Sequence, residues 1–131
     1  MKTMKQTIIA GLAVAAIALP NTVLAEPKVE VLHWWTSGGE SKAVKSLMNE
    51  FKANGGTWTD MPVAGGGGDA AMTALKARVL SGNPPTAVQL KGPSIQEWAE
   101  EGALGDLNDV GVAEKWDAVL PVQIANVMKY K

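Results

Sequence analysis

The chain contains no cysteine, and only one histidine, one phenylalanine and one tyrosine in 131 residues. Without cysteine there is no disulfide and no site for a lipid anchor behind an export signal, so stability must come from an ordinary packed core. No second histidine or cysteine exists for a metal site or a catalytic triad. We therefore expect no catalytic residue, no metal ligand and no cofactor.

An excess of charge of one sign is also missing. Lysine and arginine number 12 against 13 aspartate and glutamate residues, and they are scattered along the chain. Beyond residue 25 the balance is 10 basic against 13 acidic residues, a net charge of about −3. No basic stripe is present to neutralise phosphates, which excludes nucleic acid and an anionic membrane surface as partners.

The longest apolar run lies at the N-terminus. Two lysines precede the uncharged run Ile8–Leu19, and small residues stand where signal peptidase cleaves. A run of about a dozen residues is short of the ~20 that a spanning helix needs, which argues against the alternative of a membrane anchor. Met1–Ala25 is therefore predicted to be a cleaved secretory signal peptide. The mature chain, Glu26–Lys131, is expected to be soluble in a bacterial periplasm.

Hydrophobic periodicity beyond the signal predicts alternating strands and helices. Strands are expected at Lys28–His33, Thr57–Val63 and Thr86–Leu90, and helices at Ser41–Asn54, Ala70–Ser81, Ser94–Glu101 and from Pro121 onward. This alternation is typical of an α/β fold with a mainly parallel sheet and helices on both faces. Pro62 cannot donate to a ladder, so the second strand is placed at an edge. The expected strand order is 2-1-3, with a crevice between the first and third strands.

Local sequence also predicts details of the helices. Asp69 is expected to cap the second helix, and Ser94 with Glu97 forms a capping box for the third. On the amphipathic helices, Lys45, Lys76 and Arg78 are placed on the side that faces water. Three tryptophans are assigned to the core: Trp58, Trp98 and Trp116.

The segment Val29–Glu40, VEVLHWWTSGGE, carries the sharpest functional signal. A strand leads directly into Trp34 and Trp35, at the mouth of the first strand-to-helix crossover, where open α/β sheets bind ligands. Neighbours on an extended chain point to opposite sides, so only one of the two can face a given layer. At least one indole is expected to cover the apolar face of a sugar ring, which would contribute on the order of 1.5–3 kcal/mol. The alternative is that both belong to the core.

Polar candidates flank the same crevice. Glu40 opens a helix, where a carboxylate is favoured by the dipole by about 0.3–1 kcal/mol, and as a ligand group it would accept two sugar hydroxyls. Lys91 leaves the third strand and would donate to the sugar; the alternative is a solvated surface lysine. Gln89, between two apolar strand residues, needs a polar partner and is a further candidate for ligand binding.

Other chemistry has weaker support. Gly65–Gly68 begins a match to the dinucleotide pattern G-x-G-x-x-A, but consecutive glycines satisfy it trivially and it follows the second strand instead of the first. No Gly-Lys-Ser/Thr follows, so a P-loop is excluded. His33, at a strand end, is interpreted as a satisfied core histidine. No spacing supports Asp60 or Asp69 as a catalytic partner for Glu40.

Three stretches, VEVLHWWTSGGE, AGGGGDAAMTALKARVLSGNPPTAVQL and KGPSIQEWAEEGALGDLND, resemble the extracellular solute-binding proteins of family 1. The resemblance is greatest to glucose/mannose-type sugar-binding proteins of bacterial ABC importers, and it extends over nearly all the mature chain. It implies a type II periplasmic-binding-protein-like fold: a monomeric, two-lobed, hinged receptor that closes on a monosaccharide and delivers it to permease subunits in the inner membrane. It also implies that Trp34, Trp35, Glu40 and Lys91 line the sugar site.

Members of that family are much longer than this chain. Residues 26–131 are therefore expected to be an incomplete N-terminal lobe, with the second lobe absent, that binds sugar weakly or not at all alone. Two other classes remain open. A secreted carbohydrate-active enzyme would use Glu40 as acid or base and would need a second placed carboxylate. A nucleotide-binding α/β domain would use Gly65–Gly68.

Overall fold

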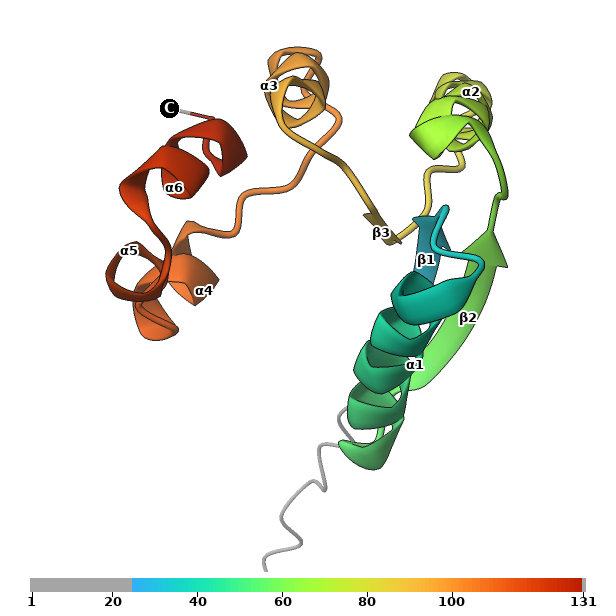
Figure 1. Ribbon diagram of the computed structural model, residues 1–131, viewed down its shortest axis with the longest axis horizontal. Coiled ribbons are helices and arrows are strands. Elements are labelled where there is room, and N and C mark those ends of the chain that lie inside the picture. Colours follow the sequence, from blue (N-terminus) through green and yellow to red (C-terminus); the bar gives the residue numbers. More distant parts are fainter. Residues whose placement is uncertain (1–24, 131) are drawn as a thin grey trace, which may run out of the picture.

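The computed structural model describes residues 25–130 (Figure 1). The predicted signal peptide lies, except for Ala25, outside the described residues. The elements are β1 (Lys28–His33), α1 (Gly38–Ala53), β2 (Thr57–Pro62), a 3-10 turn η1 (Gly66–Gly68), α2 (Asp69–Leu80), β3 (Ala87–Val88), α3 (Pro93–Glu100), α4 (Asn108–Ala113), α5 (Trp116–Val119) and α6 (Val122–Met128). Within residues 25–130 no helix is long and apolar enough to cross a membrane.

The strands form one parallel sheet in the order β2-β1-β3, which confirms the predicted α/β class and strand order. β1 pairs with β2 over its whole length, from Lys28 opposite Thr57 to His33 opposite Pro62. Pairing with β3 is confined to Val31 opposite Ala87 and Leu32 opposite Val88. The third strand is thus two residues long, much shorter than the predicted Thr86–Leu90.

Each face of the sheet packs against a different helix, because side chains alternate along β1. Leu32 is fully buried and forms the core with Ala71 and Leu75 of α2. His33, the next residue, points the other way, toward the buried Val44 of α1. Figure 1 shows α1 running alongside β2. The prediction of helices on both faces is confirmed by these contacts.

The helical pattern placed Arg78 in water, and this prediction is wrong. Its Nη1 and Nη2 donate to Oε1 and Oε2 of Glu30 at 2.8 and 2.7 Å, and its Nε donates to the carbonyl of Asn83 at 2.8 Å. The hydrogen bonds from Arg78, aided by its charge and opposed by desolvation, lower the pKa of Glu30 below its ordinary value of 4.5. This bidentate ion pair between Arg78 and Glu30 connects α2 to the central strand, β1.

The predicted side-chain caps are wrong. The residue before α2 is Gly68, with φ 112°, and Asp69 is already the first helical residue. The residue before α3 is Gly92, with φ 46°, and Ser94 lies inside the helix without a capping bond. In both places a glycine turns the chain into the helix with a backbone conformation that other residues rarely adopt.

The C-terminal helices leave much apolar surface uncovered. α4 and α5 were not predicted, while α6 follows Pro121 as expected. Trp98 packs against the core and Trp58 is half-buried, in edge contact with Phe51. The assignment of Trp116 to the core is wrong, since it is 37% exposed. Large exposed apolar side chains recur along this region: Leu107, Val110, Val112, Val119, Val122, Ile124, Val127 and Met128.

Candidate functional site

The two adjacent tryptophans lie on opposite sides of the sheet, as the alternation of an extended chain predicts. Trp34 is half-buried and packs against the core between β1 and α2. Trp35 is also half-buried but lines a pocket on the α1 side. The alternative that both belong to the core does not hold, because only Trp34 joins the core cluster.

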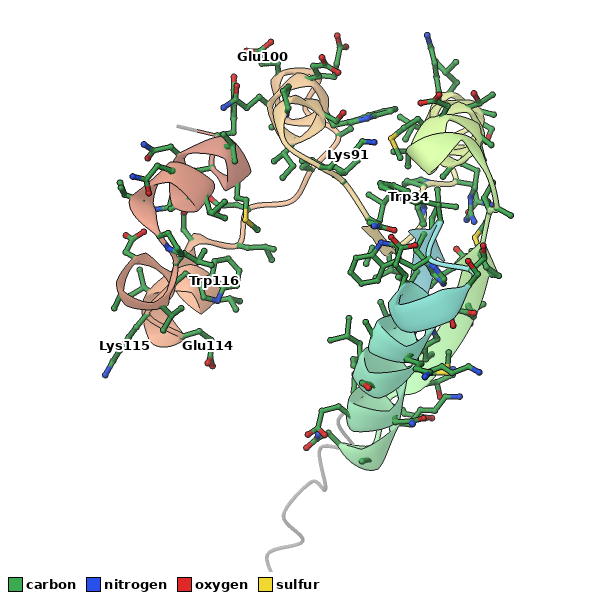
Figure 2. The ribbon with its side chains drawn as sticks, in the orientation of Figure 1. Trp34, Lys91, Glu100, Glu114, Lys115 and Trp116 are labelled. Atoms are coloured by element: carbon green, nitrogen blue, oxygen red, sulfur yellow. The ribbon has the colours of Figure 1, made fainter. Side chains whose placement is uncertain are left out.

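Trp34 has two close neighbours, the glycine turn and Lys91, the second of which is labelled with it in Figure 2. A Cβ atom at Gly68 would lie 3.1 Å from ring atoms Cδ2, Cε2 and Cε3 of Trp34, so a side chain there would require the indole to move by a few tenths of an ångström. The Lys91 Nζ lies 5.6 Å from the centroid of the same ring, within the range of a cation–π contact. Lys91 also donates to the carbonyl oxygen of Gly67 at 2.6 Å. Lys91 therefore links the glycine turn to the first tryptophan.

Gln89 completes this group. Its Oε1 accepts a hydrogen bond from the backbone N–H of Trp34 at 3.1 Å. This is the polar partner that the sequence required for a glutamine between apolar strand residues. The structure thus brings together three of the predicted site residues: Trp34, Gln89 and Lys91.

Trp35 lines a separate pocket of about 280 Å³ between the carboxyl end of the sheet and α1. Its polar lining residues are Thr36, Ser41, Lys45 and Asp60, together with His33. Its apolar lining comes from Val44, Met48 and Pro62. Lys45, which the helical pattern placed in water, contributes to this pocket although its side chain is exposed.

Behind Trp35, the buried His33 is paired with the more exposed Asp60. The Trp35 N–H donates to His33 Nδ1 at 3.2 Å, and His33 Nε2 lies 3.0 Å from Asp60 Oδ1. Because Nδ1 accepts, Nε2 carries the proton and donates. With 3% exposure and a partner at each nitrogen, His33 is the satisfied core histidine that the sequence suggested.

Asp60 remains ionised at neutral pH. Partial burial raises the pKa of this carboxyl group, but hydrogen bonds from Trp58 and His33 outweigh it and lower the pKa below its ordinary value of 3.8. Oδ1 of Asp60 accepts both hydrogen bonds, from Trp58 Nε1 at 3.1 Å and from His33 Nε2 at 3.0 Å. Among the described residues, Oδ2 has no hydrogen-bond partner and is free to accept one.

Glu40 stands apart from the other candidates. α1 begins at Gly38, three residues before the predicted start, so Glu40 lies in its first turn and is exposed. Within residues 25–130 its carboxylate forms no ion pair and no side-chain hydrogen bond. The same part of the chain holds no group of three or more His, Asp or Glu side chains able to bind a metal ion.

Sequence reasoning missed the polar lining of the Trp35 pocket. Ser41 and Lys45 are four residues apart on α1, so they share a face of the helix. The helix itself begins at Gly38, three residues after Trp35. This spacing was the signal that could have found them. Asp60 carried no comparable signal, because its approach to Trp35 depends on the register of β2 against β1.

The chain is similar over nearly its whole length to curated proteins. It is 52% identical over 129 residues, 98% of the chain, to a protein of Rhizobium meliloti (strain 1021) named "Probable sugar-binding periplasmic protein". A Brucella melitensis biotype 1 protein with the same name is 49% identical over 130 residues, 99% of the chain. These relatives are named as sugar binders. A Pyrococcus horikoshii "Uncharacterized ABC transporter extracellular-binding protein" is 31% identical over 101 residues, 70% of this chain and 21% of that protein.

The similarity covers only part of each relative. The chain spans about 30% of the length of the Rhizobium and Brucella proteins. No protein-family model matches the chain. The names of all these relatives describe binding proteins and not enzymes.

Proposed function

We propose that residues 26–131 are the first part of a periplasmic sugar receptor of family 1, which delivers a monosaccharide, glucose or mannose, to the permease subunits of an ABC importer. The receptor is a monomer with the two-lobed type II periplasmic-binding-protein fold, and these residues form an incomplete N-terminal lobe. The names of relatives that match 98–99% of the chain support this reading. The parallel sheet in the order β2-β1-β3 is compatible with it.

The observation that carries the proposal is the pair of indoles at the carboxyl end of the central strand. A sugar ring has an apolar face of C–H groups and an equator of hydroxyls, so it needs a flat aromatic surface ringed by polar groups. The Trp35 pocket offers both within about 280 Å³. Trp34 is less available, because Gly68 and the core cover much of its surface.

The proposed roles follow from these surroundings. Trp35 stacks on the sugar from the α1 side of the carboxyl edge of the sheet, and Trp34, with Gln89 and Lys91 beside it, contacts the sugar from the α2 side. Lys91 donates to sugar hydroxyls, and the exposed Glu40 accepts them at the mouth. Asp60 and Lys45 line the same pocket as Trp35 and would offer the sugar a further acceptor and donor.

The uncovered apolar side chains of α4–α6 support the view that the lobe is incomplete. Monomeric proteins rarely expose contiguous apolar patches larger than a few hundred Å², and the exposed side chains recur from Leu107 to Met128. The arithmetic of binding points the same way. Micromolar affinity requires about 8 kcal/mol, and ligand sites reach it by enclosing about 70–90% of the ligand. One lobe leaves half of a sugar in water.

Calorimetric titration tests the proposal. The full-length protein, expressed from the uninterrupted coding sequence, is titrated with glucose, mannose and a disaccharide, and residues 26–131 are titrated in parallel. We expect micromolar or tighter binding of a hexose by the full-length protein and about 100-fold weaker binding, or none, by the segment. Equal affinities would contradict the two-lobed site. Absence of sugar binding, or cleavage of the disaccharide, would refute the receptor function itself.

A matched pair of variants locates the site. Trp35→Ala removes the stacking surface and is expected to weaken hexose binding by about 10–100-fold, from the 1.5–3 kcal/mol of a buried apolar side chain. Trp116→Ala removes an indole of the same size on α5, where it is 37% exposed and far along the chain from the crevice. Equal losses in the two variants would place the sugar elsewhere.

A further inference from the structure

We infer that His33 is a positioning residue for the sugar site, holding the Trp35 backbone through Nδ1 while Asp60 holds its imidazole ring. The inference rests on the proposed function only for its effect on sugar affinity. The contacts themselves belong to the residues already described: Trp35 N–H to Nδ1 at 3.2 Å and Nε2 to Asp60 Oδ1 at 3.0 Å.

The His33 side chain replaces a bond of the sheet. β1 and β2 pair in parallel up to His33 opposite Pro62, and the Val63 N–H still donates to the His33 carbonyl at 2.8 Å. If the ladder continued with the same even spacing, the Trp35 N–H would donate to the carbonyl of Val63. It donates instead to the imidazole of His33. The side chain therefore ends the ladder and turns Trp35 out of the sheet.

A local turn completes the change of direction. The Thr36 N–H donates to the carbonyl of Trp34 at 3.0 Å, which closes a tight turn around Trp35. The Trp34 N–H is held separately by Gln89 Oε1 at 3.1 Å. Both tryptophan amides thus have side-chain acceptors, one on β1 itself and one just beyond β3. The directions of both indoles depend on these two side chains.

The imidazole can hold Trp35 in one direction because the ring itself is fixed. His33 is 3% exposed, so its nitrogens have no alternative partner in water. Asp60 Oδ1, which accepts the hydrogen bond from His33 Nε2–H, also accepts one from Trp58 Nε1 at 3.1 Å. Turning the ring over would place the ring carbons Cδ2 and Cε1 where Nδ1 and Nε2 stand, so both hydrogen bonds would be lost. A series of hydrogen bonds, from Trp58 to Asp60, from His33 to Asp60 and from Trp35 to His33, therefore fixes the Trp35 backbone relative to β2.

Two amide substitutions separate positioning from simple core packing. In His33→Asn the side-chain oxygen can occupy the place of Nδ1 and accept the Trp35 N–H, whereas the donor to Asp60 is lost. In His33→Gln the side-chain nitrogen can occupy the place of Nε2 and donate to Asp60, whereas the acceptor for Trp35 is lost. Both are neutral amides, so they differ mainly in which of the two bonds they keep.

The experiment measures hexose affinity by calorimetry and amide hydrogen exchange by NMR in full-length wild type and both variants. We expect His33→Gln to bind hexose about tenfold more weakly than His33→Asn, in proportion to a lost hydrogen bond and a displaced indole. We also expect the Trp35 amide to stay protected from exchange in His33→Asn and to lose protection in His33→Gln. If wild type binds hexose, equal affinities of the two variants, or weaker binding by His33→Asn, would overturn the inference.

The exchange measurement distinguishes this inference from the proposed function, because it needs no sugar. If wild type binds no hexose while the Trp35 amide follows the predicted order, the receptor function fails and the positioning of Trp35 stands. If the Trp35 amide is equally protected in both variants, the positioning role fails whatever the sugar affinity. A long-range ¹H–¹⁵N spectrum adds a direct check, in which wild-type His33 must carry its proton on Nε2.

Discussion

Substituting alanine for Gly68, with Gly65 as the control, isolates the contact between the glycine turn and Trp34. Both glycines have positive φ angles, 112° at Gly68 and 101° at Gly65. A Cβ at Gly65 would meet nothing within 4 Å, whereas a Cβ at Gly68 would lie 3.1 Å from three atoms of the Trp34 ring. Both variants therefore carry the cost of an alanine at positive φ, and only Gly68→Ala adds a close contact with the Trp34 ring.

The expected difference follows from these two terms. Forcing a non-glycine residue into this backbone region costs on the order of 1–3 kcal/mol, so Gly65→Ala should lower the free energy of unfolding by about that amount. Overpacking against a side chain that cannot move freely adds about 1–3 kcal/mol. Trp34 is such a side chain, since its ring packs on the core and the backbone N–H of the same residue donates to Gln89. Gly68→Ala should therefore lose about 2–6 kcal/mol in total.

Guanidinium unfolding of the two full-length variants measures the loss, and near-UV circular dichroism reports the surroundings of Trp34. We expect Gly68→Ala to be the less stable variant and to be the one whose aromatic spectrum changes. Equal destabilisation of the two variants would refute the reasoning, because it would mean that the turn does not press on the indole.

Three further predictions concern charge and exposed surface. Because Arg78 lowers the pKa of Glu30, the stability that wild type holds over Glu30→Gln should be complete above pH ~4.5 and vanish as pH falls through the lowered pKa, measured as unfolding midpoints at each pH. Lys91→Gln should weaken hexose binding about two- to fivefold in calorimetry, from a surface cation–π contact of about 0.5–1 kcal/mol with Trp34; unchanged affinity would exclude Lys91 from the site. Residues 26–131 should bind the dye ANS, whereas the full-length protein should not.

The sheet was predictable because its signals are local. Alternating strands and helices imply parallel pairing, and one proline sufficed to place β2 at the edge. The period of two along a strand likewise separated Trp34 from Trp35 before any contact was known. The short β3 was not predictable, since the sequence pattern of Thr86–Leu90 does not say how many of its residues reach β1.

The contacts that arrange the site were less accessible to sequence reasoning. Arg78 and Glu30 are 48 residues apart, and nothing in either helix or strand pattern pairs them. Asp60 meets His33 only through the register of two strands. The cap predictions failed for a different reason: glycine adopts either sign of φ, so the sequence could not say that Gly68 and Gly92 would turn left-handed and displace Asp69 and Ser94 into their helices.

The strand order 2-1-3 also sets the sequence of events in folding, because the central strand is the first to leave the ribosome or a translocation pore. Lys28 in β1 pairs with Thr57, 29 residues later, whereas Val31 pairs with Ala87, 56 residues later. Closing the second loop, nearly twice as long, costs about 0.6 kcal/mol more in chain entropy. The β1–α1–β2 unit is therefore expected to form first, with the His33–Asp60 dyad already assembled. β3, which is followed by Gln89 and Lys91, is expected to pair with β1 after that unit has formed.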